Sequence, residues 1–225
     1  MNGDRLIIGV DDAGRGCIIG PLFIGGVSMK EEVSERLRSL GVKDSKLLTP
    51  SGRERLYKLI LDESSDHVIL AIPPEEIDEF VRHRQKHTKL NYLEAMYMAR
   101  AVDSLEGEVA YIDASDTDAA FFSEQVRQNL HKQISIVATH HADRIFPVVS
   151  AASILAKVNR DREIERIKAE LGDFGSGYPS DPRTIDFLRS WIESHGQPPP
   201  YTRRSWKTWK RVGGSSVVKN LDRNI

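Results

Sequence analysis

The chain has 225 residues, 40% of them hydrophobic and 29% charged, which is the composition of a globular protein with a sizeable core. Its net charge of −1 excludes a globally basic protein, so a nucleic acid has to bind at a local patch. No apolar run approaches the roughly 18 residues that span a membrane. The single cysteine, Cys17, excludes an internal disulfide. We therefore expect a cytoplasmic protein without a signal peptide or a membrane partner.

Apolar runs and helical periodicities alternate over the first two thirds of the chain. Strands are predicted over residues 5–11, 18–29, 67–72, 108–112 and 134–138. Helices are predicted over residues 31–40, 49–61, 89–105, 117–131, 148–171 and 182–194, with Thr49 as an N-cap. The first two strands should form a hairpin through Gly14-Arg15-Gly16. This order predicts an α/β fold with a helical C-terminal portion.

Four aspartates follow predicted strands. Asp11 and Asp12 come directly after the first strand, Asp113 follows the fourth, and Asp143 lies a few residues beyond the fifth. Because strand ends line the sites of α/β sheets, these acids can converge. An oxygen-only set suits Mg²⁺ or Mn²⁺, and two such ions about 3.5–4 Å apart catalyse phosphodiester hydrolysis. Aspartates also cap helices, and for Asp113 a capping role alone remains an alternative.

Glycine and basic residues point to a phosphate backbone as the ligand. Gly14-Arg15-Gly16 combines backbone that can approach a ligand closely with an arginine that binds phosphate, although an acidic turn with a surface arginine fits equally. Two basic patches stand out, residues 82–89 and a C-terminal group. The C-terminal group, interleaved with Trp206 and Trp209, holds Arg203, Arg204, Lys207, Lys210, Arg211, Lys219 and Arg223. For either patch the alternative is an ordinary solvated surface.

Several motifs, in order along nearly the whole chain, resemble those of type 2 ribonuclease H (ribonuclease HII) in its single-chain archaeal form. They are Asp11 to Pro21, Lys43-Asp44-Ser45-Lys46, Tyr111 to Ala114, Ala142-Asp143, Ser150 to Lys157, Gly175 to Pro182 and Arg204 to Thr208. The resemblance implies a ribonuclease H-like mixed β-sheet flanked by helices. It also implies a catalytic domain over residues 1–171, with a helical substrate-binding portion over 172–225 packed on it.

The resemblance further implies an activity and a site. The activity is metal-dependent cleavage of the RNA strand of RNA–DNA hybrids and incision at ribonucleotides embedded in duplex DNA, leaving 5′-phosphate and 3′-hydroxyl ends. By position, Asp11, Asp12, Asp113 and Asp143 are the catalytic, metal-binding acids, served by Mg²⁺ or Mn²⁺ in a two-ion site. Gly14, Arg15 and Gly16 hold the ribonucleotide, Tyr178 packs on its sugar, and Lys46 is either a phosphate contact or a solvated lysine.

The sequence departs from the family pattern at two positions. Asp12 replaces the usual glutamate, which shortens the side chain by one methylene, and Cys17 replaces the usual proline and is expected to be a packing residue. The tail over residues 217–225 lacks the aromatic pair of a sliding-clamp peptide, so we do not expect that partner. We also expect the protein to be a monomer. The rival interpretations are a related Mg²⁺-dependent nuclease or phosphotransferase, and a catalytically weak hybrid-binding module.

Overall fold

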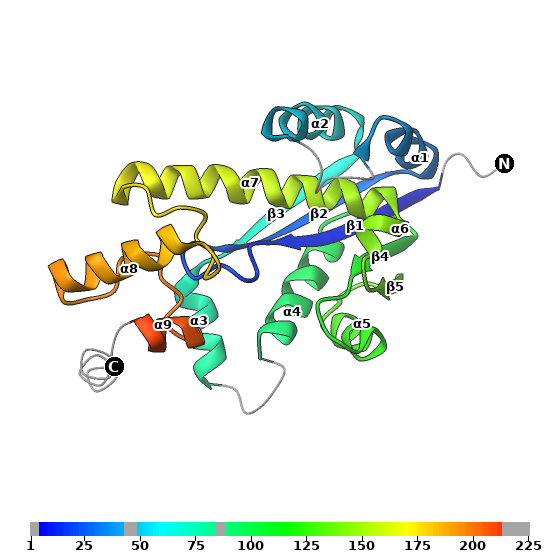
Figure 1. The fold of residues 1–225 in the computed structure, drawn as a ribbon. Helices are drawn as coiled ribbons and strands as arrows, with labels where there is room; N and C mark the ends of the chain where they lie inside the picture. Colours follow the sequence, from blue (N-terminus) through cyan, green and yellow to red (C-terminus); the bar gives the residue numbers. More distant parts are fainter. Residues whose placement is uncertain (1–4, 43–48, 84–88, 213–225) are drawn as a thin grey trace. The chain divides into compact units, whose positions relative to one another are not determined.

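The computed structural model describes residues 5–42, 49–83 and 89–212. Five strands form one mixed sheet in the order β3-β2-β1-β4-β5 (Figure 1). Their bounds are β1 Leu6–Ala13, β2 Leu22–Lys30, β3 Asp66–Ile72, β4 Val109–Asp113 and β5 Ser135–Thr139. β1 pairs antiparallel with β2 and parallel with β4, and β4 pairs parallel with β5. The predicted mixed α/β sheet is therefore confirmed.

Helices are more numerous than the sequence predicts. They are α1 Glu31–Ser39, α2 Pro50–Glu63, α3 Pro74–His83, α4 Lys89–Asp103, α5 Ala119–Gln128, α6 Ala142–Ile145, α7 Pro147–Leu171, α8 Pro182–His195 and α9 Lys207–Val212. The predicted N-cap is confirmed, because Thr49 accepts a hydrogen bond from the Gly52 amide at 3.1 Å. In the described ranges no helix is long and apolar enough to cross a membrane.

The sequence predictions of local structure differ from the structure at the start of the second strand, and they missed helices α3, α6 and α9. The second strand starts at Leu22 instead of residue 18, because residues 14–21 form a loop that makes only an isolated bridge, between Ile19 and Thr202. Helix α3 was missed, because Pro73-Pro74 looked only like the end of a strand; Pro74 instead occupies the first position of the helix, where a missing N–H costs nothing. The predicted pairing of the first two strands as an antiparallel hairpin is confirmed.

Contacts divide the chain into two compact units. Unit 1 comprises residues 1–13, 23–71 and 86–159, and unit 2 comprises residues 14–22, 72–85 and 160–225. The units are discontinuous in sequence, unlike the single boundary after residue 171 that the sequence suggests. The assignment of a catalytic and a substrate-binding portion on either side of that boundary stays a prediction.

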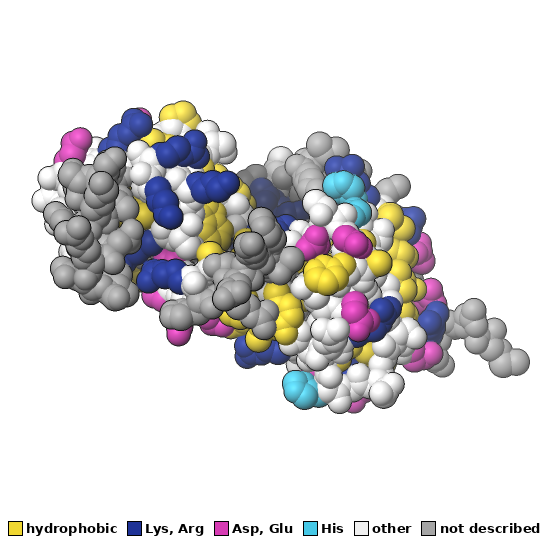
Figure 2. All heavy atoms as spheres, turned by 90° about the horizontal axis from the view of Figure 1, so that it is seen from below, with side chains coloured by type: hydrophobic (Ala, Val, Ile, Leu, Met, Phe, Trp, Pro, Cys, Tyr) yellow, Lys and Arg dark blue, Asp and Glu magenta, His cyan; other side chains and the backbone are white. Residues whose placement is uncertain are grey.

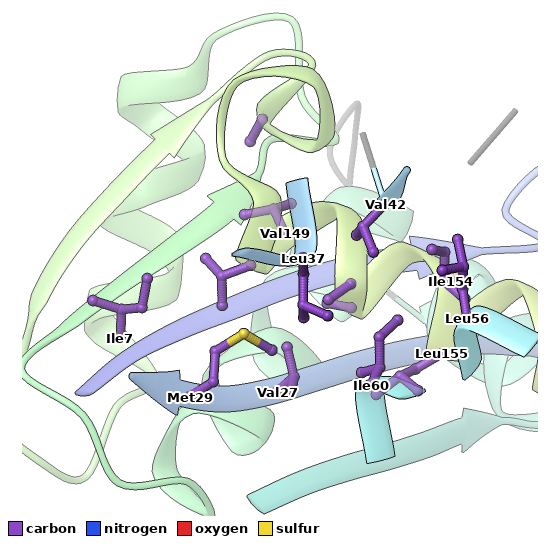
Figure 3. Close-up of a cluster of buried hydrophobic side chains, with 14 of the residues drawn as sticks. Ile7, Val27, Met29, Leu37, Val42, Leu56, Ile60, Val149, Ile154 and Leu155 are labelled. Carbon is purple, nitrogen blue, oxygen red and sulfur yellow. The ribbon is translucent and has the colours of Figure 1, made fainter. Parts of the chain in front are cut away.

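The core of unit 1 lies between the sheet and helices α1, α2 and α7. Figure 3 shows side chains of β1 and β2, such as Ile7 and Met29, facing Leu37 of α1, Ile60 of α2 and Val149 of α7. Helices α4 and α5 cover the other face of the sheet (Figure 1). The sheet is thus buried on both faces, so a charged group within its central strand leaves water on folding.

Glycines let α7 approach the strands closely. A Cβ added to Gly9 would come within 2.2 Å of the Val148 carbonyl oxygen, and one added to Gly25 within 2.5 Å of the Ala152 carbonyl oxygen. Both glycines lie on the face of the sheet that α7 covers. Gly26 lies on the opposite face, where its added Cβ would meet Ala101 of α4 and Leu105, which lies two residues beyond that helix. Because side chains alternate between the two faces along a strand, these contacts show which face each neighbouring side chain of β1 and β2 occupies.

Candidate active site

Asp11 is a carboxylate inside the sheet, at the third-last position of β1, and is 4% exposed. Burial raises the pKa of its carboxyl well above the usual range, and the charges of Asp12 and Asp113 add to that rise. Ser153 of α7 counteracts part of it by donating a hydrogen bond to the carboxylate. Asp11 is therefore an acid whose negative charge the protein alone stabilises poorly.

Asp11 and Asp12 project to opposite faces of β1. Asp11 is paired with Gly25, which lies on the face that α7 covers. Asp12 lies two residues after Val10 and therefore on the same face as Val10, whose partner Gly26 faces α4. The Asp12 amide donates to Asp11 Oδ1 at 2.7 Å, and the Asp12 carboxylate accepts from the Ser115 hydroxyl at 3.5 Å. The two acids are thus close enough to repel each other, yet they reach the site from different sides.

Asp113 and Asp143 come from two neighbouring elements of unit 1. Asp113 ends β4, directly after the pair Val10–Ile112, so it lies beside Asp11 in the parallel register. Its Oδ1 accepts a 2.8 Å hydrogen bond from the amide of Ala142, the first residue of α6. Asp143 follows Ala142 in the chain and is 5% exposed. The fold therefore places Asp113 beside Asp11, and Asp143 directly follows the residue whose amide binds Asp113. The convergence of all four acids on one site stays a prediction.

A divalent cation fits the chemistry of these donors, but the carboxylates alone do not enclose one. No three His, Cys, Asp or Glu side chains in the described ranges are grouped as a metal cage. Mg²⁺, however, commonly binds one or two carboxylates and completes its shell with water and substrate phosphate oxygens. Asp11 and Asp113 are oxygen donors whose mutual repulsion a cation relieves. These two acids fit such an ion, and the ligand roles of Asp12 and Asp143 stay predictions.

Ser153 and Lys157 were missed as parts of this cluster. Lys157 Nζ donates to Ser153 Oγ at 2.7 Å, and Ser153 in turn donates to Asp11. Ser153 therefore connects α7 to the Asp11 carboxylate on β1. Two polar residues four positions apart on the apolar face of a long helix were the available signal.

The Gly14–Gly20 loop belongs to unit 2 and begins immediately after β1. The Cys17 amide donates to the Gly14 carbonyl at 3.2 Å, which closes a turn. Gly14 has φ +89°, which favours glycine, and its added Cβ would lie 3.1 Å from the side chain of Arg160. Cys17 is fully buried and burial raises the pKa of its thiol, as expected of a packing residue.

Tyr178 lies against this loop. A Cβ added to Gly16 would come within 3.4 Å of the Tyr178 ring, and the Ile18 amide donates to the Gly177 carbonyl at 2.8 Å. The guanidinium carbon of Arg160 lies 5.4 Å from the ring centre of Tyr178. The structure therefore brings three sequence-predicted residues, Gly14, Gly16 and Tyr178, into one loop pair.

Asp181 organises the loop that carries Tyr178. It caps α8 by accepting from the Arg183 amide at 3.0 Å, and it accepts from the Ser176 amide at 2.7 Å. The Ser176 hydrogen bond is the main reason that the pKa of Asp181 falls to about 2. Thr184 joins the same loop through the Phe174 carbonyl and the Gly177 amide. A helix N-terminus thus holds the loop beside Gly16.

The C-terminal basic group is only partly a surface patch. Arg204, Lys207, Lys210 and Arg211 are exposed, and Figure 2 shows Lys and Arg side chains gathered over the end of unit 2 that carries α9. Arg203 is fully buried, so its prediction as a surface phosphate contact is wrong. Its guanidinium binds backbone carbonyls instead. Lys46, Lys219, Arg223 and most of the 82–89 patch lie outside the described residues.

Comparison with known proteins places the chain in a family. The family model described as ribonuclease HII matches residues 8–209. A ribonuclease HII from Pyrococcus horikoshii is 44% identical over 92% of both chains. The crystal structure of ribonuclease H2 from that organism superposes with a TM-score of 0.85, covering 92% of this chain and 97% of that one.

Two further solved structures are similar. The ribonuclease HII of Archaeoglobus fulgidus, solved in a complex with PCNA, is 41% identical over 90% of this chain and 95% of its own, with a TM-score of 0.81. Bst-RNase HIII, solved with Mn²⁺, shares the fold at 20% identity and a TM-score of 0.76, over 94% of this chain and 70% of its own.

The fold and the buried acids at its strand ends define a ribonuclease H-like nuclease. Within that class, the chain belongs to the ribonuclease HII family. It is an enzyme, an endonuclease with ribonuclease H activity on RNA–DNA hybrids.

Proposed function

We propose that the chain is a divalent-metal-dependent endoribonuclease that also incises duplex DNA at single embedded ribonucleotides, leaving 5′-phosphate and 3′-hydroxyl ends. The observation that carries the metal dependence is the environment of Asp11. This buried carboxylate has its pKa raised by burial and by two neighbouring acids, which disfavours its charged form without a cation. A bound pair of divalent ions supplies water activation and stabilisation of the leaving oxygen.

In this proposal the residues of unit 1 hold the acids in place. Ser153 and Lys157 support the Asp11 carboxylate from α7, and the Ala142 amide orients Asp113. Asp12 and Asp143 complete the set of metal-binding acids. A hard oxygen-donor site of this kind accepts Mg²⁺ or Mn²⁺, and the Mn²⁺ complex of Bst-RNase HIII, a protein of the same fold, is consistent with it.

In this proposal, residues of unit 2 recognise the ribose. The Tyr178 ring lies so near Gly16 that a Cβ added there would touch it, so the loop backbone and the ring can bind the same nucleotide, the ring packing on its sugar. The 2′-hydroxyl is both a donor and an acceptor, and it is the group that distinguishes RNA from DNA. Arg15 is the phosphate contact of the same loop. Lys46, which lies outside the described residues, is proposed as a further one.

The complex of the Archaeoglobus fulgidus relative with PCNA bears on partners. We expect no clamp peptide in this chain, because its tail lacks an aromatic pair. Those tail residues lie outside the described part of the chain, so that expectation stays a prediction. Co-elution of the full chain with a sliding clamp tests it.

The function is tested with a labelled DNA duplex that contains one ribonucleotide. The wild-type protein should cut on the 5′ side of that residue when Mg²⁺ or Mn²⁺ is present, and cleavage should cease when a chelator removes the ion. Asp11→Asn and Asp113→Asn should each lose most turnover while keeping the fold. Asp186→Asn, on the exposed face of α8, is the matched control. Binding without cleavage under all conditions would favour the hybrid-binding module, and rapid cleavage of an all-DNA duplex would favour another nuclease.

A further inference from the structure

Arg203 is a fully buried cation whose three nitrogens all donate to one loop. Nε donates to the Gly20 carbonyl at 2.9 Å, Nη1 to the Arg15 carbonyl at 2.8 Å, and Nη2 to the Gly14 carbonyl at 2.8 Å. Charge-assisted hydrogen bonds of this length are about twice as strong as neutral ones. One side chain therefore holds both ends of the Gly14–Gly20 loop.

The backbone around Arg203 binds the same loop. The Arg203 amide donates to the Ile18 carbonyl at 2.8 Å, and the Gly20 amide donates to the Tyr201 carbonyl at 2.9 Å. Tyr201 has φ +63°, a conformation that is costly for a side chain of its size. Such outliers persist where the surrounding structure imposes them, often at functional sites. The segment 201–203 is thus shaped to fit the loop.

Asp78 of α3 anchors the next residues of that segment. Its carboxylate accepts from the Arg204 amide at 2.7 Å, from the Ser205 amide at 2.9 Å and from the Ser205 hydroxyl at 2.6 Å. Asp78 is only 3% exposed. Arg203 is therefore presented to the loop by a segment that is itself tied to a helix of unit 2.

These contacts determine how the peptide groups of the loop are oriented. A trans peptide is planar, with its N–H pointing opposite to its C=O. Because Arg203 holds the carbonyls of Gly14 and Arg15, the amide N–H groups of Arg15 and Gly16 point away from Arg203. We propose that Arg203 is the positioning residue of ribose recognition, turning these two amides toward the bound ribonucleotide. This inference rests on the proposed assignment of the loop to the ribonucleotide.

The shape of the guanidinium explains why an arginine is required. Its planar fork offers donors in several fixed directions, whereas a lysine ammonium is a compact charge at the end of a flexible stem. Arg203→Lys keeps the charge but cannot span the carbonyls of Gly14, Arg15 and Gly20 together. The loop should then remain present with its peptide groups free to reorient.

The first test compares Arg203→Lys with Arg189→Lys, the same change at an exposed position of α8. Both are assayed on the duplex that contains one ribonucleotide, and their thermal unfolding is followed. Arg203→Lys should lower kcat by about 10²-fold, as expected when a reacting group is misplaced by about an ångström, with a smaller change in KM. Arg189→Lys should match the wild type. A folded Arg203→Lys protein with wild-type kcat would overturn the inference.

The second test uses the wild-type chain and holds even if Arg203→Lys does not fold. Hydrogen exchange at the amides of Arg15 and Gly16 is measured in chelator without nucleic acid, with the single-ribonucleotide duplex and with the all-DNA duplex of the same sequence. Only the ribonucleotide duplex should slow exchange at these two amides. Equal exchange with both duplexes would overturn the inference. If the wild-type protein cannot incise the single-ribonucleotide duplex, the proposed function fails first, and the two failures are thereby distinguished.

Discussion

Asp12 stands where the family usually has glutamate, and its environment differs from that of Asp11. It projects toward the α4 face of β1, and its carboxylate makes a long, 3.5 Å hydrogen bond with the Ser115 hydroxyl. It also lies close enough to Asp11 to raise the pKa of that acid. A side chain shorter by one methylene reaches a metal ion less closely than glutamate, which affects ions with strict geometry most.

We therefore predict that the metal preference depends on this residue. Mg²⁺ requires near-octahedral coordination at about 2.0–2.1 Å, so the wild-type protein should favour Mn²⁺ over Mg²⁺ more than a glutamate-bearing relative does. Asp12→Glu should raise turnover with Mg²⁺, and Asp12→Ala should be severely impaired with either ion. Steady-state rates at matched ion concentrations check this. Equal rates for the three forms would mean that position 12 is not a ligand.

At the scale of elements, helix α7 is held against the sheet by backbone contact. Gly9 and Gly25 leave no room for a Cβ, and the atoms they meet belong to the backbone of α7. The same helix supplies Ser153 to Asp11. The packing of α7 and the support of the candidate acid therefore depend on the same close approach.

Gly9→Ala should destabilise the protein by at least about 3 kcal/mol, since overpacking against immobile backbone cannot be relieved by a rotamer change. Gly41→Ala provides the control. Gly41 has φ +96° with nothing within 4 Å of an added Cβ, so only the backbone conformation opposes the change, at about 1 kcal/mol. Denaturant unfolding measures both. Similar decreases in stability for the two variants would contradict the close approach of α7.

A second prediction for an element concerns Asp181 and the start of α8. The folded protein lowers the pKa of this acid to about 2, chiefly through the Ser176 amide, from about 3.9 in the unfolded chain. A depressed folded pKa contributes stability above the unfolded value, and that stability is lost as the pH falls toward 2. Asp181→Asn should therefore be less stable than wild type at neutral pH.

The difference in stability between Asp181→Asn and the wild type should narrow as the pH falls from about 4 to about 2. Asp186→Asn removes a charge further along α8 and should show no comparable narrowing. Thermal unfolding across this pH range compares the variants. A constant difference between Asp181→Asn and wild type would mean that the Ser176 and Arg183 amides do not bind the ionised form preferentially.

For the whole molecule, a net charge of −1 means that association with a polyanion depends on where the cations lie. Arg204, Lys207, Lys210 and Arg211 are exposed in and before α9. Contacts of such residues with phosphates orient a duplex but do not read its bases. We therefore predict that these residues contribute to the strength of duplex binding and not to the recognition of the ribonucleotide.

The double variant Lys207→Gln/Lys210→Gln should weaken duplex binding equally across sequences. Its salt dependence should be shallower, by a slope of about 0.9 for each phosphate that the protein no longer neutralises. The double variant Arg5→Gln/Arg127→Gln removes the same charge from exposed positions of unit 1 and should leave the slope unchanged. Binding is measured over a range of salt concentrations. An unchanged slope in the first variant would show that the patch is only a solvated surface.

Much of the fold was predictable because its signals are local. The apolar runs before Asp11 and Asp113 indicate buried strands, and Thr49 followed by Pro50 indicates a helix start. Helix α9 was not predictable, because its six residues are too few for a helical period to be distinguished. Helix α3 was hidden by the prolines at its start.

The candidate site was predictable in part. Its acids and glycines belong to contiguous motifs, whereas the residues that support them do not. Ser153 and Lys157 reach Asp11 only because α7 packs on the sheet. Arg203 looked like one more surface cation, since arginines are rarely buried without partners, and its partners are carbonyls that no sequence pattern reveals.

The sequence by itself determined the order of the strands and of most helices, the candidate acids and the family, because hydrophobic period, capping residues and contiguous motifs are written along the chain. Only the tertiary structure decided that Asp11 is a buried acid among like charges, that Asp12 reaches from the other face, and that Arg203 holds the Gly14–Gly20 loop. Those properties arise from burial and from contacts between residues far apart in sequence. They therefore exist only once the chain has folded.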